Sequence, residues 1–468
     1  MTLRRTKIIC TIGPATASYP VLESMAKAGM NLVRLNMSHA DHRGAADVIQ
    51  WVRTLNRKVR DPISVILDTQ GPEIRTGDVS EPMDLQTGQV ETLSVRGDDD
   101  VETSSIQVNY QELADIVEPG NRITVDNGLI NFEVLETHGK QLVCRVIDGG
   151  WLGSKRHVNL PGVRINLPAI TAKDRADIEF GLEQEVDYIA LSFVRTAEDV
   201  ERLRSLIAQH QARTLILAKI EDQEGVSNIH AIAQAADGVM VARGDLGIET
   251  DIADLPNVQR RIVHACARWG RRCIVATHLL ESMIENPIPT RAEVTDVANA
   301  VYEGADAVML SGETSIGKHP VRCVEQLVQI TKAAERYPGL GYESDLEAAT
   351  DKQQLAIHAV ALAESIYADG IVVITRRGVM ADLVTNARPP TVPIYAFTND
   401  SRTRRRLFLN RAVTSFRAEF SLEPEKTLQR AFGVLRDRQV LGGNAKVVVI
   451  SDVLAGAKTD AIQIRQID

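Results

Sequence analysis

A lysine and two carboxylates stand at the ends of two short apolar runs. Residues 215–218 lead into Lys219 and Glu221, and residues 238–241 lead through a glycine turn to Asp245. Apolar runs of this length are typical of buried parallel strands, and ligands collect where such strands end. A lysine beside two carboxylates can hold a divalent metal next to a phosphate, because carboxylates are hard oxygen ligands and the ammonium offsets phosphoryl charge. The alternative is a salt bridge that merely closes the two strand ends.

Eight such apolar runs occur in the chain, and most begin about 25–35 residues after the one before. Helix-patterned sequence lies between them, for example at residues 19–28 and 197–209. This alternation predicts a (β/α)8 TIM barrel, whose strands all end at one face. The eight runs are residues 7–11, 31–36, 64–68, 188–192, 215–219, 238–241, 273–277 and 307–310.

An insertion interrupts the barrel pattern, because about 120 residues separate the third run from the fourth. Within it, residues 122–125 and 141–146 are short alternating stretches separated by turn dipeptides at 127–128 and 149–150. Such stretches predict a compact all-β module. Placed over the strand ends, the inserted domain would act as a lid that expels water from the site.

A second α/β pattern follows the barrel. After a helical pattern at 324–336, a Pro-Gly-Leu-Gly turn at 338–341 marks a boundary. Beyond it, helical patterns alternate with strands, which predicts an open, mostly parallel sheet. The helical patterns are residues 354–367 and 379–386, and the strands are residues 370–375, 393–397 and 446–451. The predicted domains are a barrel (1–72 and 167–340), an inserted β lid (73–166) and a C-terminal α/β regulatory domain (341–468).

Length and composition agree with this division. A chain of 468 residues accommodates about three domains of roughly 150 residues. The net charge of −9 argues against nucleic acid or an anionic membrane as a partner, and no run approaches the roughly 18 apolar residues of a membrane span. The cysteines are odd in number and lack C-x-x-C pairing, which predicts free buried thiols in a reducing cytoplasm. They are Cys10, Cys144, Cys266, Cys273 and Cys323.

Four stretches carry a resemblance over essentially the whole chain. They are residues 34–39 (RLNMSH), 71–77 (GPEIRTG), 241–247 (VARGDLG) and 286–317, which contains PTRAE and MLSGET. In this order and spacing the chain resembles the pyruvate kinase family. The resemblance implies transfer of the phosphoryl group of phosphoenolpyruvate to ADP, giving pyruvate and ATP, the last step of glycolysis.

The resemblance assigns roles to the first cluster of residues. It implies Mg²⁺ (or Mn²⁺) on Glu221 and Asp245, since Mg²⁺ usually takes one or two carboxylates and fills its shell with water and substrate oxygens. Lys219 would stabilise the transferring phosphoryl group and the enolate. The backbone N–H groups of Gly244 and Asp245 would hold the substrate carboxylate. Thr277 would protonate the enolate carbon through a water, because a hydroxyl alone is a poor acid.

The resemblance also implies a K⁺ site with hard oxygen ligands. Asn36, Ser38, Asp68 and Thr69 match the ligands that the family uses. Members with glutamate at the position of Glu73 need K⁺, whereas members with lysine there do not. The physical logic is charge balance, since a bound cation or an ammonium offsets the reacting anions. We therefore expect activity that depends on K⁺.

Arginines and residues at or after the end of the second apolar run complete the expected substrate sites. Arg34 and Arg75 would bind phosphate oxygens, because the planar guanidinium fork suits phosphate. The resemblance implies nucleotide binding by Asn36, His39, Arg75 and Arg156. For His39 the simpler interpretation is a packing or surface imidazole.

The chain departs from the family pattern at several positions. Gln70 and Arg156 stand where the family has lysine, Asn127 replaces one of two aspartates, and His278 replaces a glutamine. None of these changes removes a metal ligand or Lys219, so they bear on nucleotide affinity rather than on activity. His278 has the same alternative as His39, a surface imidazole.

The C-terminal domain gives a less specific signal. Its loop at 375–380 has few hydroxyls, so a sugar-phosphate activator cannot be carried over from the family; a phosphorylated metabolite could still bind through Arg376, Arg377 and the helix start that follows. We expect Glu303 and Asp306 to lie on a helix surface. Four arginines are expected to form a solvated helix face, with phosphate-effector binding as the alternative. They are Arg402, Arg404, Arg405 and Arg406.

The sequence therefore predicts a cytoplasmic pyruvate kinase that uses Mg²⁺ and K⁺ and, by resemblance, forms a homotetramer. One rival is another barrel enzyme that handles a pyruvate enolate, which would have no use for a lid over ADP. The other rival is a catalytically silent, metabolite-binding regulatory protein. That hypothesis would need the loss of Lys219, Glu221 or Asp245, and all three are present.

Overall fold

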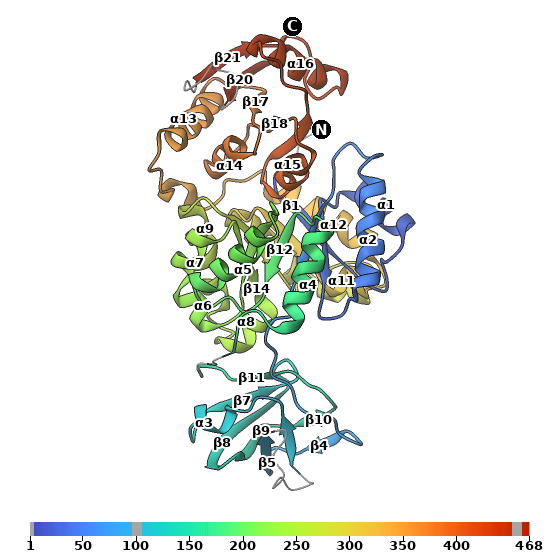
Figure 1. Cartoon of the computed structure of the whole chain (residues 1–468), viewed down its shortest axis with the longest axis vertical. Coiled ribbons are helices and arrows are strands. Elements are labelled where there is room, and N and C mark those ends of the chain that lie inside the picture. Colours follow the sequence, from blue (N-terminus) through green and yellow to red (C-terminus); the bar gives the residue numbers. More distant parts are fainter. Residues whose placement is uncertain (1–3, 96–104, 164, 166, 452–460, 468) are drawn as a thin grey trace.

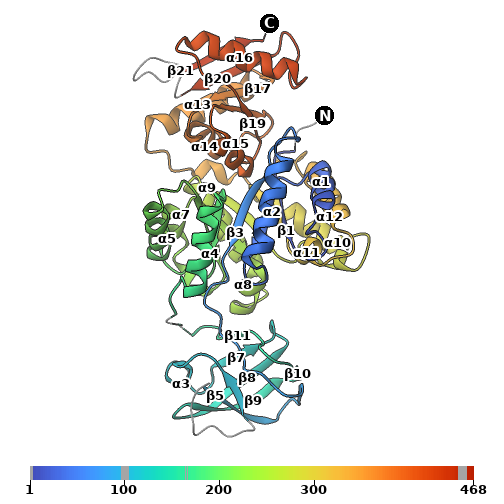
Figure 2. The same cartoon turned by 45° about the vertical axis from the view of Figure 1, so that its right-hand side comes forward.

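The computed structural model describes residues 4–95, 105–163, 165, 167–451 and 461–467. Three bodies follow one another along the long axis, with the barrel in the middle (Figure 1). The C-terminal domain covers one end of the barrel and the inserted β domain lies beyond the other end, an order that Figure 2 shows again after a turn of 45°. Residue 166, at the predicted end of the lid, lies outside the described residues.

Eight parallel strands close into a barrel, which confirms the predicted fold class. All residues of the first strand and of the sixth are buried, because one face packs inside the barrel and the other packs against helices. The strands, in their order around the barrel, are β1 (Lys7–Ile12), β16 (Ala307–Leu310), β15 (Arg272–Ala276), β14 (Gly238–Ala242), β13 (Leu215–Ile220), β12 (Tyr188–Leu191), β3 (Ser64–Asp68) and β2 (Leu32–Asn36).

Helices surround the barrel, and local capping fixes several of their starts. Thr171 and Asp174 form a capping box at one helix, and Thr290 and Glu293 form another. The helices of this part are α1 (Tyr19–Ala28), α2 (His42–Leu55), α4 (Ala172–Glu183), α5 (Ala197–Gln209), α6 (Gln223–Ser227), α7 (Ile229–Ala235), α8 (Arg243–Glu249), α9 (Leu255–Arg268), α10 (Arg291–Tyr302), α11 (Gly312–Ser315) and α12 (Pro320–Ala334), with 3₁₀ turns η1 (Glu281–Ile284) and η2 (Tyr342–Asp345).

The inserted domain has its own sheets and its own core, with Leu93, Phe132 and Val146 fully or almost fully buried. The predicted turn at 127–128 is present between the strands at 122–125 and 130–138, and Asn127 adopts a positive φ of 56° there. One four-residue helix, α3 (Leu113–Ile116), departs from the expected all-β module. Its strands are β4 (Met83–Leu85), β5 (Val90–Val95), β6 (Ile106–Val108), β7 (Arg122–Val125), β8 (Ile130–His138), β9 (Gln141–Asp148), β10 (Gly150–Leu152) and β11 (Val158–Asn159).

The C-terminal domain is a five-stranded sheet with helices on both faces. Four strands are parallel and the fifth is antiparallel, as expected for a mostly parallel sheet; β19 and β21 were not among the predicted strands. In spatial order the strands are β19 (Val413–Arg417), β18 (Ile394–Thr398), β17 (Gly370–Ile374), β20 (Lys446–Ser451) and β21 (Ala461–Gln466). The helices are α13 (Asp351–Ser365), α14 (Val379–Asn386), α15 (Ser401–Arg406) and α16 (Pro424–Asp437), with the 3₁₀ turn η3 (Leu407–Leu409).

The expected surface position of Asp306 is wrong. Its side chain is fully buried just before β16, where its carboxylate pairs with Arg272 at 3.0 Å and with Arg388 of the C-terminal domain at 3.1 Å. Burial opposes the ionised carboxyl, but the two arginines outweigh that effect and lower the pKa of Asp306. A barrel carboxylate thus anchors the C-terminal domain.

Two further surface predictions fail for a related reason. Glu303 is buried and accepts hydrogen bonds from Gln259 of α9 and from Asn299 of α10. The arginines of α15 do not form a solvated face, because Arg405 pairs with buried Asp187 of the barrel at 3.1 Å and Arg404 donates to the carbonyl of Arg60 at 2.6 Å. The basic helix is therefore a contact between domains.

Removing the carboxylate of Asp306 should weaken this junction severely. In Asp306→Ala, two buried arginines lose their carboxylate partner. This loss should lower the free energy of unfolding by about 3–5 kcal/mol. Asp345→Ala is the control, because its carboxylate is 58% exposed, has only a surface contact of 2.8 Å with His264 Nε2, and should contribute less than about 1 kcal/mol. The measurement is the urea midpoint of the first unfolding transition, and equal shifts for the two variants would contradict the assignment.

Candidate active site

The ammonium of Lys219 is the centre of a buried charge array at the carboxyl end of the barrel. The side chain is only 9% exposed, and Nζ lies 3.1 Å from Asp68 Oδ1 and 3.0 Å from Glu221 Oε1. It also donates a hydrogen bond of 2.7 Å to Ser192 Oγ. Burial works against the charged form, but the two carboxylates raise the pKa of Lys219 above its ordinary value. The lysine is therefore a fixed cation at neutral pH.

Asp68 links this lysine to a second cation. Its carboxylate is fully buried at the end of β3 and accepts a hydrogen bond of 2.5 Å from Arg34 Nε at the next strand. Burial alone would raise the pKa of Asp68, but Arg34 and Lys219 lower it. The other guanidinium edge is held by Thr11, whose Oγ1 accepts from Arg34 Nη1 at 3.1 Å. Two strand ends thus fix two cations around one carboxylate.

Glu221 and Asp245 face the array from the neighbouring strand ends. Glu221 Oε2 accepts a hydrogen bond of 2.7 Å from the backbone N–H of Phe193. Burial raises the pKa of Glu221 to about 7, with Lys219 opposing and Asp245 adding to the shift. The pKa of Asp245 is also raised by burial. Because Asp245 raises the pKa of Glu221 and burial raises the pKa of both carboxyls, the pair forms a site that favours an added cation.

Thr277 adjoins Gly244 in the first turn of α8, the helix that carries Asp245; the glycine turn expected before Asp245 is thus helical. Its backbone has a positive φ of 72°, and its carbonyl accepts a hydrogen bond of 2.7 Å from Arg243 Nη2. Arg243 is itself paired with Asp296 at 2.7 Å. A Cβ on Gly244 would lie 3.2 Å from Thr277 Cγ2, so glycine permits this close approach. Arg243 therefore holds Thr277, with its positive φ, against the first turn of α8.

A polar cavity of about 380 Å³ lies between the strand ends and the lid, and most of the predicted site residues line it. Asp68 and Thr69 are buried behind this wall, and Gly244 and Thr277 stand beside it. The predicted residues on the cavity wall are Arg34, Asn36, Ser38, His39, Glu73, Arg75, Arg156, Lys219, Glu221 and Asp245.

Several wall residues already have partners within the chain. Arg75 pairs with Glu73 at 2.6 Å, and Gln70 donates to the same Glu73 oxygen at 2.9 Å. Arg156 of the lid pairs with Asp126 at 3.2 Å and is half exposed. Both arginines can therefore turn toward an anion in the cavity. The departure at Gln70 has a local explanation, since its amide holds Glu73.

The donor sets fit hard cations in two places. Glu221 and Asp245 offer two carboxylates, and within the described ranges no group of three or more His, Cys, Asp or Glu side chains forms a metal site. For a monovalent ion, Asp68 Oδ1 is buried, and among the residues that the structure describes only the Lys219 ammonium lies beside it, at 3.1 Å. Asn36 Oδ1 accepts only a long hydrogen bond of 3.2 Å, from the Ser38 N–H. Such under-satisfied oxygens are what a hard cation needs.

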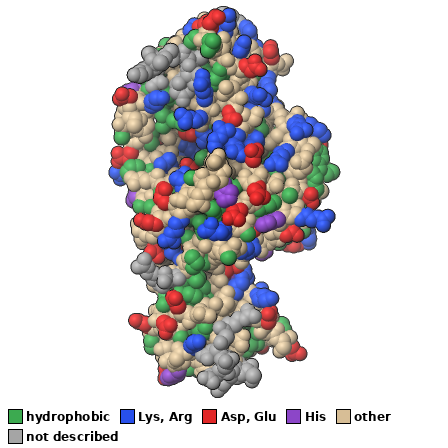
Figure 3. All heavy atoms as spheres, in the orientation of Figure 1, with side chains coloured by type: hydrophobic (Ala, Val, Ile, Leu, Met, Phe, Trp, Pro, Cys, Tyr) green, Lys and Arg blue, Asp and Glu red, His purple; other side chains and the backbone are tan. Residues whose placement is uncertain are grey.

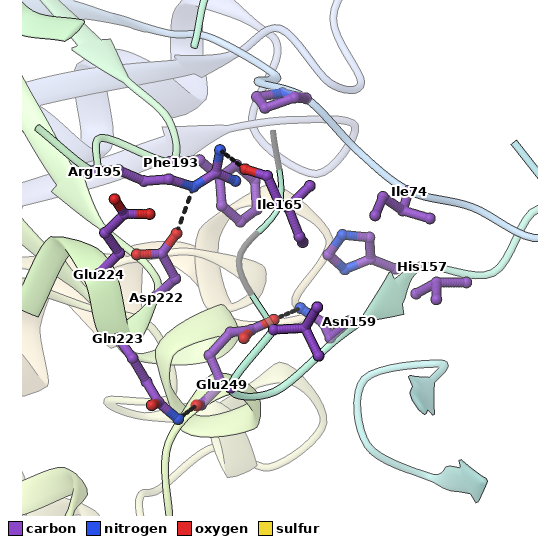
Figure 4. Close-up of a pocket in the computed structure, with 14 residues that line it drawn as sticks. Ile74, His157, Asn159, Ile165, Phe193, Arg195, Asp222, Gln223, Glu224 and Glu249 are labelled. Atoms are coloured by element: carbon purple, nitrogen blue, oxygen red, sulfur yellow. Dashed lines mark hydrogen bonds and ion pairs between the residues drawn. The ribbon is translucent and has the colours of Figure 1, made fainter. Parts of the chain in front are cut away.

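A second, smaller pocket marks the hinge between barrel and lid (Figure 4). Asn159 of β11 donates a hydrogen bond of 2.8 Å to Glu249 at the end of α8, the helix whose first turn contains Asp245. Arg195 pairs with Asp222 and donates to the carbonyl of Ile165 at 3.1 Å. In both overall views α8 lies at the barrel end that faces the lid (Figures 1 and 2). The lid is thus fastened to the helix that carries Asp245.

Several residues of the site, Thr11 among them, were not predicted. Ser192 and the backbone of Phe193 hold Lys219 and Glu221, His157 of the lid lies 3.7 Å from Asp245, and Arg243 holds Thr277. Ser192 closes the fourth apolar run, so its place at a strand end could have identified it. The role of Phe193 rests on its main chain and could not be found from side-chain types.

Barrel, lid and charge array together define a barrel enzyme whose site is built for anionic, phosphate-bearing substrates. The barrel-domain model of pyruvate kinase matches residues 3–324, and the model of its alpha/beta domain matches residues 353–465. The chain therefore belongs to the pyruvate kinase family. Its activity is that of a phosphotransferase.

Individual relatives agree over nearly the whole chain. The chain is 38% identical to plastidial pyruvate kinase 2 of Arabidopsis thaliana, over 99% of this chain and 81% of that protein. It is 38% identical to a pyruvate kinase of Dictyostelium discoideum, over 99% of this chain and 94% of that protein. A crystal structure of a pyruvate kinase from Cryptosporidium parvum superposes with a TM-score of 0.94 at 32% identity and covers 99% of this chain and 96% of that one. None of the described helices is long and apolar enough to cross a membrane.

The hinge contact should respond to pH when a second carboxylate is added. Burial raises the pKa of Glu249 to about 7, so its carboxyl is neutral below this pH and ionised above it. In Asn159→Asp the new carboxylate would repel ionised Glu249, and hydrogen exchange of residues 157–163 should rise about tenfold at pH 8, the equivalent of one pKa unit. At pH 6 the protonated Glu249 can donate to the new carboxylate, so the rise should be small.

Glu249→Gln is the matched control for this experiment. Alone, its neutral amide keeps a hydrogen bond with Asn159; combined with Asn159→Asp, it should remove the pH dependence of the rise in hydrogen exchange, because position 249 no longer ionises. Equal exchange in wild type and Asn159→Asp at pH 8 would show that this contact does not hold the lid.

Proposed function

We propose that this enzyme transfers the phosphoryl group of phosphoenolpyruvate to ADP, giving pyruvate and ATP. The observation that carries the proposal is the fixed ammonium of Lys219, which stands between two carboxylates on the wall of a lid-covered cavity. A trianionic substrate needs a cluster of cations that does not reorganise during the reaction.

Glu221 and Asp245 would hold Mg²⁺ or Mn²⁺ in this proposal. Their mutual repulsion and burial favour a divalent cation, and two carboxylates match the usual protein contribution to a Mg²⁺ site. When bound, the metal supplies Lewis-acid stabilisation of the enolpyruvate and phosphoryl oxygens. Asn36, Ser38, Asp68 and Thr69 would hold K⁺, for which the buried Asp68 oxygen is the strongest support.

The chain's own residues would carry the transfer as follows. Lys219 stays protonated and stabilises negative charge on the phosphoryl group in flight and on the enolate left behind. Arg34 binds phosphate oxygens from the cavity wall, where Asp68 and Thr11 fix its orientation. The N–H groups of Gly244 and Asp245 orient the substrate carboxylate. Proton delivery to the enolate carbon goes through a water that Thr277 positions, because the hydroxyl is too weak an acid to donate directly.

The nucleotide would enter between the barrel and the lid. Asn36 and His39 line the barrel side, while Arg75 and Arg156 approach from the side of the lid. Arg75 and Arg156 would exchange their carboxylate partners for nucleotide phosphates. A guanidinium–phosphate contact is stronger than the half-exposed guanidinium–carboxylate pairs that these arginines now form. The lid would exclude water that could otherwise accept the phosphoryl group.

The C-terminal domain, the assembly and the location belong to the same proposal. Arg376 and Arg377 are exposed just before α14, where a phosphorylated effector could be held. A homotetramer is proposed from family membership. The five cysteines are buried and unpaired, which supports a reducing cytoplasm.

Pyruvate formation from phosphoenolpyruvate and ADP with Mg²⁺, in K⁺ and in Na⁺ buffer, tests the function. Lys219→Met should lower kcat by at least about 10²- to 10³-fold, because the fixed charge opposite the phosphoryl group is lost. The control is Lys318→Met, an exposed lysine paired with Glu285, and it should retain wild-type turnover. Wild-type turnover should be clearly higher in K⁺.

Each alternative result has a separate meaning. Turnover that is equal in K⁺ and Na⁺ would overturn only the argument from Glu73. If well-folded wild type shows no turnover with or without candidate effectors, the regulatory-protein hypothesis replaces the proposal.

A further inference from the structure

A cleft of about 760 Å³ separates the barrel from the C-terminal domain. Its barrel wall comes from the ends of α10 and α12, and its other wall comes from the segment after α14. Arg388 on that wall pairs with Asp306, at the amino ends of the barrel strands. The cleft therefore lies at the end of the barrel opposite to the catalytic cavity, and it is separate from the loop at 375–380.

Basic side chains dominate the cleft. Five of its lining residues are Lys or Arg and three are Glu. Two of the glutamates are already engaged, since Glu335 accepts from the backbone N–H of Arg5 at 2.9 Å and Glu303 accepts from Gln259 at 2.8 Å. On the face shown in Figure 3, Lys and Arg side chains also gather along the junction of barrel and C-terminal domain. An excess of positive charge remains within the cleft.

Arg411 is the most unusual of these cations. It is 9% exposed, and its Nε is buried without a hydrogen-bond partner among the residues that the structure describes. Its backbone N–H donates to Asp306 Oδ1 at 3.4 Å. Burial, together with Arg5 and Arg388, lowers the pKa of Arg411 to about 10. The side chain is still charged at neutral pH.

A buried guanidinium without a partner is strongly unfavourable. The neighbouring Arg5 has the same deficiency at one atom, because its Nε is buried without a hydrogen-bond acceptor and meets Glu335 only at 3.9 Å. Arg388, in contrast, is satisfied by Asp306. Arg5 is otherwise held, because its Nη2 donates to the carbonyl of Glu335. A buried Nε without an acceptor on each of two neighbouring arginines beside one cleft indicates a missing anion.

We propose that this cleft binds the phosphate group of a small phosphorylated metabolite, with Arg411 as its main contact. The planar guanidinium fork matches two phosphate oxygens, and a dianion offsets the charges of Arg411 and Arg5 together. Lys332 also lines the cleft and adds a flexible ammonium. The remaining space would hold the uncharged part of the metabolite.

The ligand would bridge two domains. Arg5 and Lys332 belong to the barrel side, and Arg411 and Arg388 belong to the C-terminal domain. Binding would therefore stabilise the junction between the domains, since a ligand that needs both walls favours the state in which they are together. This inference does not depend on the proposed reaction.

Inorganic phosphate serves as the probe, titrated into the full-length protein at constant ionic strength, with the rise in Tm as the readout. Arg411→Met should weaken phosphate binding by about tenfold or more, as expected for a lost hydrogen bond to a charged group. Arg417→Met, an exposed arginine on β19 outside the cleft, makes the same charge change and should bind phosphate as wild type does. Both variants keep the catalytic cavity, so its own affinity for phosphate cancels in the comparison.

Equal phosphate affinity in Arg411→Met and Arg417→Met would overturn the proposal. Succinate is the second arm, and succinate binding as tight as phosphate binding, with the same dependence on Arg411, would overturn the assignment to phosphate. If Arg411→Met does not fold, Lys332→Ala at the barrel wall replaces it, with a severalfold loss of phosphate affinity expected and unchanged affinity contradicting the site.

Discussion

The site depends on a buried cation that carboxylates hold in place. Burying the charged Lys219 alone would be strongly unfavourable, and the carboxylates of Asp68 and Glu221 stabilise its charged form. The same contact orients the rest, because Asp68 also fixes Arg34 and Glu221 is in turn held by the Phe193 backbone. One interaction therefore sets the position of both cations that would face phosphate.

The two ends of the barrel have different roles: one carries the catalytic cavity and the other binds the C-terminal domain. At the carboxyl ends, short strands deliver charged side chains to a cavity that the lid covers, and Asn159 fastens the lid to α8. At the amino ends, buried Asp187 and Asp306 bind arginines of the C-terminal domain. The same eight strands therefore carry the catalytic cavity at one end and the junction with the C-terminal domain at the other.

The sequence predicted the barrel and most of the site because strand-end residues must meet in this fold. Lys219, Glu221 and Asp245 were found in this way, and the structure brings them together. Contacts between domains could not be predicted, because Asp306 and Arg405 look like surface residues until the partner domain covers them. Backbone contributions such as that of Phe193 were also missed, since no side-chain type signals them.

The most direct test of the account is the position of Mn²⁺ in crystals of the protein, located by anomalous scattering. The account predicts a peak coordinated by Glu221 and Asp245, beside the ammonium of Lys219. A peak elsewhere, for example among Asp222 and Glu249 of the hinge pocket, with none at the predicted carboxylates, would contradict the central role given to this charge array.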